Sequence, residues 1–297
     1  MDYVRTLSRE FDVGSRLDLS IENRSGAISV RGDDTMTASV EVIAHLWAED
    51  EQEADDQLEL IARGIRHEGE RLTIRAPALL RPKPFLFFGR GPRIEYQVVV
   101  PRTCRASIVS RSGRAEVESI SGPLELIARS GRASAREIAG AVSVISSSGA
   151  TQLERVAGDV SIESRSGGVR VGGCKGKCSI KSRSGSVQVE DVAEDVELET
   201  RSGATSVSDV GGALKLTARS GSVRYDGAVR GPFSVDVWSG SIRLSIDPDS
   251  VFFIDAESSH GSVRSDLSMR SKPSAPPADA PTVRLRTRSG SIVIEPR

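Results

Sequence analysis

Arginine residues that recur at a regular spacing are the side chains with the clearest capacity for chemistry. An Arg-Ser-Gly tripeptide repeats at multiples of 18 residues, beginning at Arg111, Arg129, Arg165, Arg183, Arg201 and Arg219. Guanidinium groups bind carboxylate, sulfate and phosphate oxygens through paired N–H donors. If successive repeats stack in register, these arginines form a linear cationic stripe. The spacing therefore makes these arginines a candidate anion-binding column for a polyanion, such as an acidic glycan or a nucleic-acid backbone.

A purely structural role for the same arginines is the interpretation that the sequence favours. Each side chain would lie across its neighbour or pair with a nearby acid such as Glu163, Glu197 or Glu199. Two like charges about 5 Å apart in water repel by only roughly 0.8 kcal/mol, so a column is tolerable without a ligand. The formal net charge of −1 and the absence of aromatic residues interleaved in the repeat disfavour nucleic acid. Position 147 interrupts the series with serine.

The sequence lacks the patterns that identify common catalytic centres. It contains no Gly-x-Ser-x-Gly nucleophile elbow. The segment GGCKGKC at 172–178 is one residue short of a phosphate-binding loop and has Cys178 where Ser or Thr would bind magnesium. The outward-facing acids Glu116, Glu154 and Glu190 fall on different repeats, whereas glycosidases need paired carboxylates. We therefore predict a protein that is not an enzyme and that uses no cofactor.

Cysteine and histidine are too sparse to suggest a metal centre or a disulfide framework. The chain has three of each, and no histidine lies near a cysteine in sequence. Cys174 and Cys178 fill positions that hold Val156 and Val160 one repeat earlier. This substitution pattern indicates two small core residues. A local disulfide across the intervening turn is the alternative.

A dense aromatic cluster gives a second candidate surface. Phe85, Leu86, Phe87 and Phe88 lie within RPKPFLFFGRGPR, a segment at 81–93 that is rich in proline and glycine. Such a cluster can serve as a protein or membrane contact loop. More often such a loop folds down as a plug over the end of the core.

The elements that must position these residues are short strands separated by glycine. One glycine recurs every 18 residues from Gly113 to Gly221, and a second marks most half-repeats. The runs between them alternate apolar and polar residues, which is typical of strands with one buried face. One repeat buries about five apolar side chains, worth roughly 1.5–3 kcal/mol each. Ordering its residues costs about 1.5 kcal/mol each, so a single repeat cannot fold alone.

Stacking of identical repeats solves this problem, and it predicts an all-β protein. We expect a right-handed parallel β-helix, or solenoid, of 18-residue coils. The runner-up is an antiparallel meander or sandwich, but hairpin turns such as Asn-Gly are absent from the repeats. A left-handed hexapeptide helix is disfavoured because its apolar residues would recur every six positions.

The expected organisation has four parts. Residues 1–107 form an N-terminal β-rich cap with one short helix near 48–63. The solenoid repeats occupy 108–269, a flexible surface loop covers 270–281, and 282–297 supplies a final coil. The cap would protect one open end of the solenoid from edge-to-edge aggregation.

The chain resembles the bacterial "putative adhesin" family of β-helix proteins, a domain of unknown function. The likeness lies in FDVGSRLDLSIENRSGAISVRG at 11–32 and in the repeated Ser-Gly-x-Val coils. The resemblance implies a β-helix fold and a role at the cell envelope, with no adhesive residue pattern that can be carried over. The N-terminus, in contrast, has no apolar core of signal-peptide length, which predicts a cytoplasmic protein without a membrane span.

These observations favour a non-catalytic, adhesin-like or scaffold binding protein that acts through the regular faces of a solenoid. Its expected partner is an acidic glycan or another protein, and self-association is a further option. One alternative function is a regulatory docking protein in envelope-stress signalling. A second is a polysaccharide-active β-helix enzyme.

Overall fold

The computed structural model describes residues 1–77, 92–267 and 280–297. They fall into two compact units, Met1–Gly149 and Ala150–Arg297. Both units are built mainly from parallel strands stacked in successive coils, which confirms the predicted all-β solenoid. The chain has one helix among the described residues, in the first unit, as expected.

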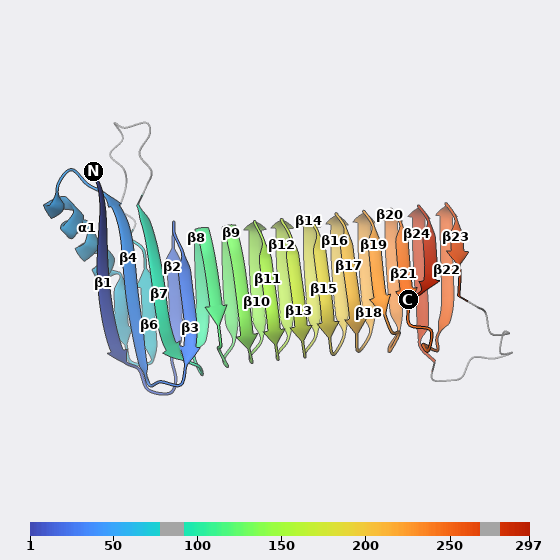
Figure 1. Cartoon of the computed structure of the whole chain (residues 1–297), viewed down its shortest axis with the longest axis horizontal. Coiled ribbons are helices and arrows are strands. Elements are labelled where there is room, and N and C mark those ends of the chain that lie inside the picture. The colour runs from blue at the N-terminus through green and yellow to red at the C-terminus, as the bar shows by residue number, and fades with distance from the viewer. Residues whose placement is uncertain (78–91, 268–279) are drawn as a thin grey trace. The chain divides into compact units, whose positions relative to one another are not determined.

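Each coil of the second unit contains two strands, which belong to two parallel sheets (Figure 1). In spatial order, the first sheet contains β12 (Val160–Ser166), β14 (Cys178–Ser184), β16 (Val196–Ser202), β18 (Leu214–Ser220), β20 (Phe233–Ser239), β24 (Thr282–Ser289) and β22 (Phe253–His260). The second sheet contains β11 (Thr151–Val156), β13 (Val169–Cys174), β15 (Val187–Val192), β17 (Thr205–Val210), β19 (Val223–Gly227), β21 (Ile242–Ile246), β25 (Ile292–Pro296) and β23 (Val263–Ser265).

The core lies between these two sheets and is made by the alternating apolar residues. In the coil that starts at β15, Val187, Val189, Val192, Val196 and Leu198 are all at most 1% exposed. The register places each residue over the equivalent residue one coil away, so that Ile180 of β14 lies between Ile162 and Leu198. The 18-residue pitch thus produces continuous apolar columns, as the sequence predicts.

The Ser-Gly corner joins the two strands of a coil and needs glycine for two reasons. Gly185 has a φ of +121°, a conformation that L side chains rarely adopt. A Cβ added there would lie 2.0 Å from the carbonyl oxygen of Gly167 in the preceding coil. The backbones of adjacent coils therefore touch at this corner, which explains why the glycine spacing is so regular.

The first unit has the same two-sheet plan, with antiparallel strands added at one end. One sheet contains β1 (Asp2–Asp12), β4 (Thr37–Trp47), β7 (Arg93–Pro101) and β3 (Ile28–Asp33), in which β4 is antiparallel to both β1 and β7. The other contains β5 (Ile65–Glu68), β6 (Arg71–Arg75), β2 (Asp18–Asn23) and β10 (Val142–Ser148). Two long strands, β8 (Arg105–Glu118) and β9 (Leu124–Ile138), run through the corner and contribute to both.

Helix α1 (Glu51–Arg63) packs against β1, β4 and β5, at the end of the first unit where the antiparallel strands lie (Figure 1). It starts three residues later than expected because Asp50 is extended and caps it, accepting a hydrogen bond from the Glu53 backbone N–H at 2.8 Å. An ion pair of 2.6 Å between Arg5 and Asp55 ties the helix to β1. Ala54 is buried on the helix face that meets the sheet.

The order of the last coils in space differs from their order in sequence. β24 and β25, the last strands of the chain, lie between β20/β21 and β22/β23. The inward residues Ile254 and Val263 of the outermost coil are therefore 39% and 45% exposed, whereas Val283 and Ile292 beside them are fully buried. The final coil of the sequence is thus an internal coil of the structure.

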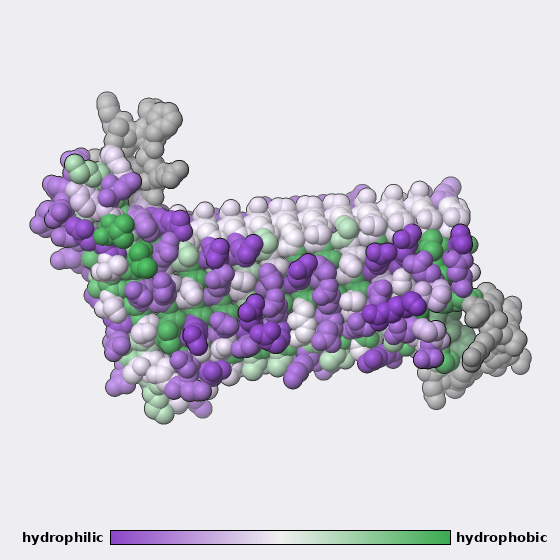
Figure 2. All heavy atoms as spheres, viewed as in Figure 1, coloured by the Kyte–Doolittle hydropathy of each residue, from purple (hydrophilic) through white to green (hydrophobic). Residues whose placement is uncertain are grey.

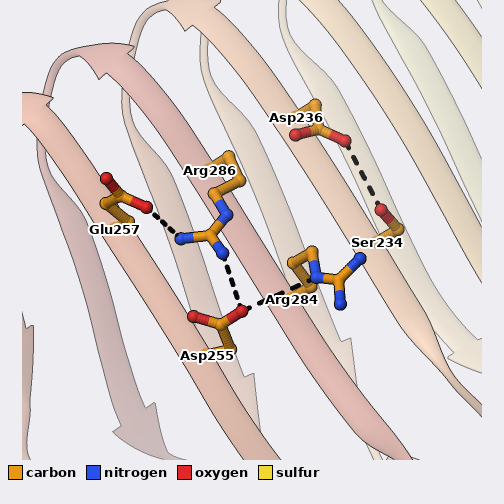
Figure 3. A network of polar contacts seen from close by, with 6 residues as sticks. All are labelled: Ser234, Asp236, Asp255, Glu257, Arg284 and Arg286. Atoms are coloured by element: carbon orange, nitrogen blue, oxygen red, sulfur yellow. Dashed lines mark hydrogen bonds and ion pairs between the residues drawn. The ribbon is translucent and has the colours of Figure 1, made fainter.

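Charge alternation between strands favours this order (Figure 3). Arg286 of β24 forms ion pairs with Glu257 and, at 2.7 Å, with Asp255 on β22. In register, Arg286 separates Glu257 from Asp236 of β20. Without β24 between them, these two acids would be direct cross-strand neighbours, and like charges in that position are destabilising.

Candidate polyanion-binding site

Four arginines lie at the ends of four successive strands of the second unit. Arg165, Arg183, Arg201 and Arg219 each precede the corner serine on β12, β14, β16 and β18. The flanking residues are in register from strand to strand, which places the arginines one above another at about the 4.8 Å strand spacing. All four are exposed. We call this set the arginine column.

None of the ion pairs formed among the described residues involves the arginine column. Of the predicted acidic partners, Glu197 instead pairs with Lys215 at 2.8 Å. Hydrogen bonding from Lys215 also lowers the pKa of Glu197. Neither Glu163 nor Glu199 lies within 4.0 Å of an arginine of the column. The ion pairs that the structural interpretation expected between these acids and the arginine column are therefore not formed.

A ledge of small residues runs beside the column along the Ser-Gly corner. The corner serines bond back to the previous coil: Ser184 Oγ donates to the Arg165 carbonyl at 3.4 Å, and Ser202 Oγ donates to the Arg183 carbonyl at 3.3 Å. Because a Cβ on the corner glycines would strike the next backbone, no larger side chain can occupy that row. Figure 2 shows this edge of the second unit as a pale row without large side chains. The surface beside the arginines is therefore free of large side chains.

The column continues with an aromatic residue and a further cation. Trp238 of β20 and Arg288 of β24 occupy the position equivalent to the arginines. The guanidinium carbon of Arg288 lies 4.2 Å from the centroid of the Trp238 ring, a cation–π contact. Trp238 is nevertheless 58% exposed. Sequence reasoning did not assign these residues to the column, because their adjacency depends on the changed order of the last coils.

The remaining predicted column residues lie in the first unit. Arg111 is exposed and pairs with Glu22 at 3.1 Å, so part of its charge is neutralised. Arg129 is exposed and lies beside it, since Ser112 is in register with Ser130. The predicted contact loop Phe85, Leu86, Phe87 and Phe88, like nearly all of the loop expected at 270–281, falls outside the described residues.

The cysteines are core residues. Cys174 and Cys178 are free and at most 2% exposed, in agreement with the core interpretation. Cys174 Sγ donates to the Gly176 carbonyl at 3.3 Å. Burial raises the pKa of Cys178 to about 12 and that of Cys104 also to about 12, which keeps both thiols protonated and unreactive at neutral pH.

Two searches of the described residues bear on other kinds of site. No group of three or more His, Cys, Asp or Glu side chains in the described part of the chain is arranged to hold a metal ion. None of the helical residues described forms a segment of the length and apolarity that crossing a membrane requires.

Comparison with known proteins places the chain in a family. The family model described as Toastrack DUF4097 matches residues 136–295. No curated protein matches the sequence. One similar solved structure is a putative cell adhesion protein from Clostridium sporogenes, with 10% sequence identity and a TM-score of 0.24 over 99% of this chain and 100% of that one. Because the family model spans more than half of its residues, this chain belongs to the Toastrack DUF4097 family.

Proposed function

We propose that this protein is a non-catalytic binding scaffold that holds an extended polyanion, an acidic glycan, along the arginine column. The observation that carries this proposal is the unpaired state of Arg165, Arg183, Arg201 and Arg219, four stacked guanidinium groups without a carboxylate partner in the described structure. Neighbouring members repel by roughly 0.9 kcal/mol in water at 4.8 Å. A bound polyanion removes this repulsion and accepts charge-assisted hydrogen bonds from each arginine.

The rigidity of the scaffold supports the same function. The strands that carry the arginines are fixed by parallel pairing on both sides, and the corner serines bond to the preceding coil. Because the protein backbone is already ordered, only the ligand's backbone loses conformational entropy on binding, which lowers the total entropy cost. A regular array of cations on a flat ledge suits a repeating chain better than a compact small molecule.

Two of the ionisable groups with raised pKa values lie in the core and need no catalytic explanation. Burial raises the pKa of the Tyr225 phenol to about 12, as it does for the Cys178 thiol. Both side chains point into the core, where a substrate cannot reach them. These shifts are explained by packing between the two sheets, and they do not mark an exposed catalytic group.

Calorimetric titration at low salt with oligogalacturonate and with inorganic polyphosphate tests the proposal. Serine occupies the column position naturally at Ser147, so Arg183→Ser/Arg201→Ser is a conservative double variant. We expect it to weaken binding of both polyanions by about tenfold, equal to about 1.4 kcal/mol. The matched control is Arg224→Ser/Arg243→Ser, a stacked, exposed pair on the second sheet with the same charge change.

The control separates a site from a general charge effect. If the arginine column is the site, the control double variant changes affinity by less than about threefold, a difference of under 1 kcal/mol. Equal losses in the two double variants, with the unfolding midpoints unchanged, would show that binding follows net charge alone. Absence of binding by the unmodified protein would reject the function.

A further inference from the structure

An aromatic residue replaces arginine at one position of the second unit's column. Trp238 lies beside Arg219, because Val237 is in register with Ala218 and Ser239 with Ser220. On its other side, the same register places it beside Arg288. A tryptophan thus stands between two cations on the edge that carries the ledge. Phe233 and Tyr225, in contrast, are buried, and their ring centroids lie 4.8 Å apart.

The exposure of Trp238 leaves part of its ring available to a ligand. Arg288 lies over the ring, yet 58% of the residue is open to solvent. The indole is a large, rigid and mainly apolar surface that gains free energy when it is covered. A ligand with a flat apolar patch can therefore bind at this point of the column.

The stacked position of Arg288 prepares it to bind an anion. A guanidinium group that lies on an aromatic ring keeps its N–H donors in the guanidinium plane, where a carboxylate can accept two of them. Stacking also restricts the side chain before a ligand arrives, so less rotamer entropy is lost on binding. Trp238 and Arg288 together provide an apolar surface next to a guanidinium group that is already oriented to bind an anion.

Resting on the proposed function, we infer that Trp238 is the specificity-determining residue of the column and selects uronic-acid chains over other polyanions. A pyranose ring presents an apolar C–H face that suits the part of the indole left open by Arg288, and a carboxylate on such a chain would lie along a row in which Arg219 and Arg288 flank Trp238. Inorganic polyphosphate has the charge but no ring. Single-stranded nucleic acid stacks its bases on a series of aromatic residues, whereas this column supplies one.

Titrations with four probes test the inference: oligogalacturonate, the corresponding neutral oligogalactoside, inorganic polyphosphate and an oligothymidylate of equal charge. Trp238→Ala is expected to weaken oligogalacturonate binding at least tenfold and polyphosphate binding less than threefold. Trp238→Phe, which keeps a ring, is expected to retain most of the affinity. Trp47→Ala removes the only other tryptophan and serves as the matched control, with no expected change.

Fluorescence provides a second measurement. In a Trp47→Phe background Trp238 is the sole tryptophan, so its emission should shift with oligogalacturonate and stay constant with polyphosphate. Equal effects of Trp238→Ala on both polyanions, or no effect on either, would overturn the inference. Tighter, Trp238-dependent binding of oligothymidylate would also overturn it and point to nucleic acid. If Arg183→Ser/Arg201→Ser still weakens polyphosphate binding in those cases, the proposed function stands without the inference.

Discussion

The two corners of each coil in the second unit follow different rules. At the Ser-Gly corner, a Cβ on Gly203 would lie 1.9 Å from the Gly185 carbonyl oxygen. At the opposite corner, a Cβ on Gly212 would first meet the Asp195 side chain at 2.5 Å, and Glu194 occupies the equivalent position one coil earlier. A Cβ on Gly212 would also meet backbone, the Glu194 carbonyl carbon at 2.9 Å, so contact with backbone alone does not separate the two corners. They differ in conformation: the glycines of the Ser-Gly corner, here called the constant corner, have positive φ values, whereas Gly212 of the opposite, variable corner does not, and Glu194 fits at that position.

The corners also differ in how they bind the neighbouring coil. Neutral serine hydroxyls donate to carbonyl groups at the Ser-Gly corner, as Ser202 does to Arg183. At the opposite corner, carboxylates accept backbone N–H groups: Asp159 from Lys177 and Asp195 from Ala213, both at 2.9 Å. Only the neutral, glycine-defined corner borders the arginine column. The invariant backbone contact therefore also supplies the flat surface on which we place the ligand.

The largest expected effect distinguishes the two glycines directly. Gly203→Ala combines a strained φ of +130° with a clash against backbone, and it should reduce the free energy of unfolding by about 3–5 kcal/mol. Gly212→Ala should reduce it by less, about 1–2 kcal/mol, because its φ is not in the left-handed region, although the new Cβ still lies 2.9 Å from the Glu194 carbonyl carbon. Urea unfolding of both variants measures the difference. Similar losses at the two positions would contradict the distinction between the corners.

A pH effect is expected from the interior of the variable corner. Cys178 has a folded-state pKa of about 12 against an ordinary value of 9.0, because burial disfavours the thiolate. Its contribution to stability is complete below pH 9 and is lost as the pH rises toward 12, by roughly 2 kcal/mol at pH 10.5. Cys178→Val, which copies Val160 and Val196, should reduce this alkaline loss. Unfolding midpoints from pH 8 to 11 that fall equally in both proteins would refute the assignment.

The interior of the constant corner contains buried hydroxyl groups. Ser164, Ser182 and Thr200 are stacked in register, and their hydroxyl oxygens have no hydrogen-bond partner in the described structure. Ser182→Ala should raise the free energy of unfolding by about 1 kcal/mol, because an unsatisfied buried hydroxyl is destabilising. Ala218 shows that alanine fits this column. A loss of stability would instead indicate that a buried water bonds the hydroxyls.

The smallest effect concerns the acid sensitivity of the variable corner. The Ala213 N–H holds the pKa of Asp195 below its ordinary value, so the stabilisation is present above that value and is lost as the pH falls through the folded-state pKa. Asp195→Asn should flatten the acid limb of the stability profile. Ser202→Ala, at the other corner, should shift the whole profile without changing its slope. An unchanged acid limb in Asp195→Asn would contradict this account.

Much of the fold could be predicted from the sequence because the repeat is local. The glycine pitch, the alternating strands and the interior positions of Val187 and Leu198 follow from spacing and pattern alone. The left-handed conformation of Ser119, Glu137 and Arg155 near the ends of their strands could not be predicted, because residues other than glycine, asparagine and aspartate seldom adopt it.

The features that sequence reasoning missed depend on contacts between distant segments. In the sequence β22 follows β20, so the sequence order does not reveal that β24 pairs with β20 instead. Charges offered a signal, since Asp236, Arg286 and Glu257 alternate only in the observed order. The contact between Trp238 and Arg288 follows from that order, so the candidate site was predicted for its arginines and missed at its aromatic end.

The salt dependence of binding tests the central claim most directly. Each arginine that contacts a polyanion releases counterions, which contributes roughly 0.7 to the slope of log affinity against log salt for a single-stranded polyanion. Arg183→Ser/Arg201→Ser should therefore reduce the slope for oligogalacturonate by roughly 1.4 relative to the unmodified protein. Arg224→Ser/Arg243→Ser should leave the slope unchanged. Parallel salt plots for the unmodified protein and the column variant would contradict the account.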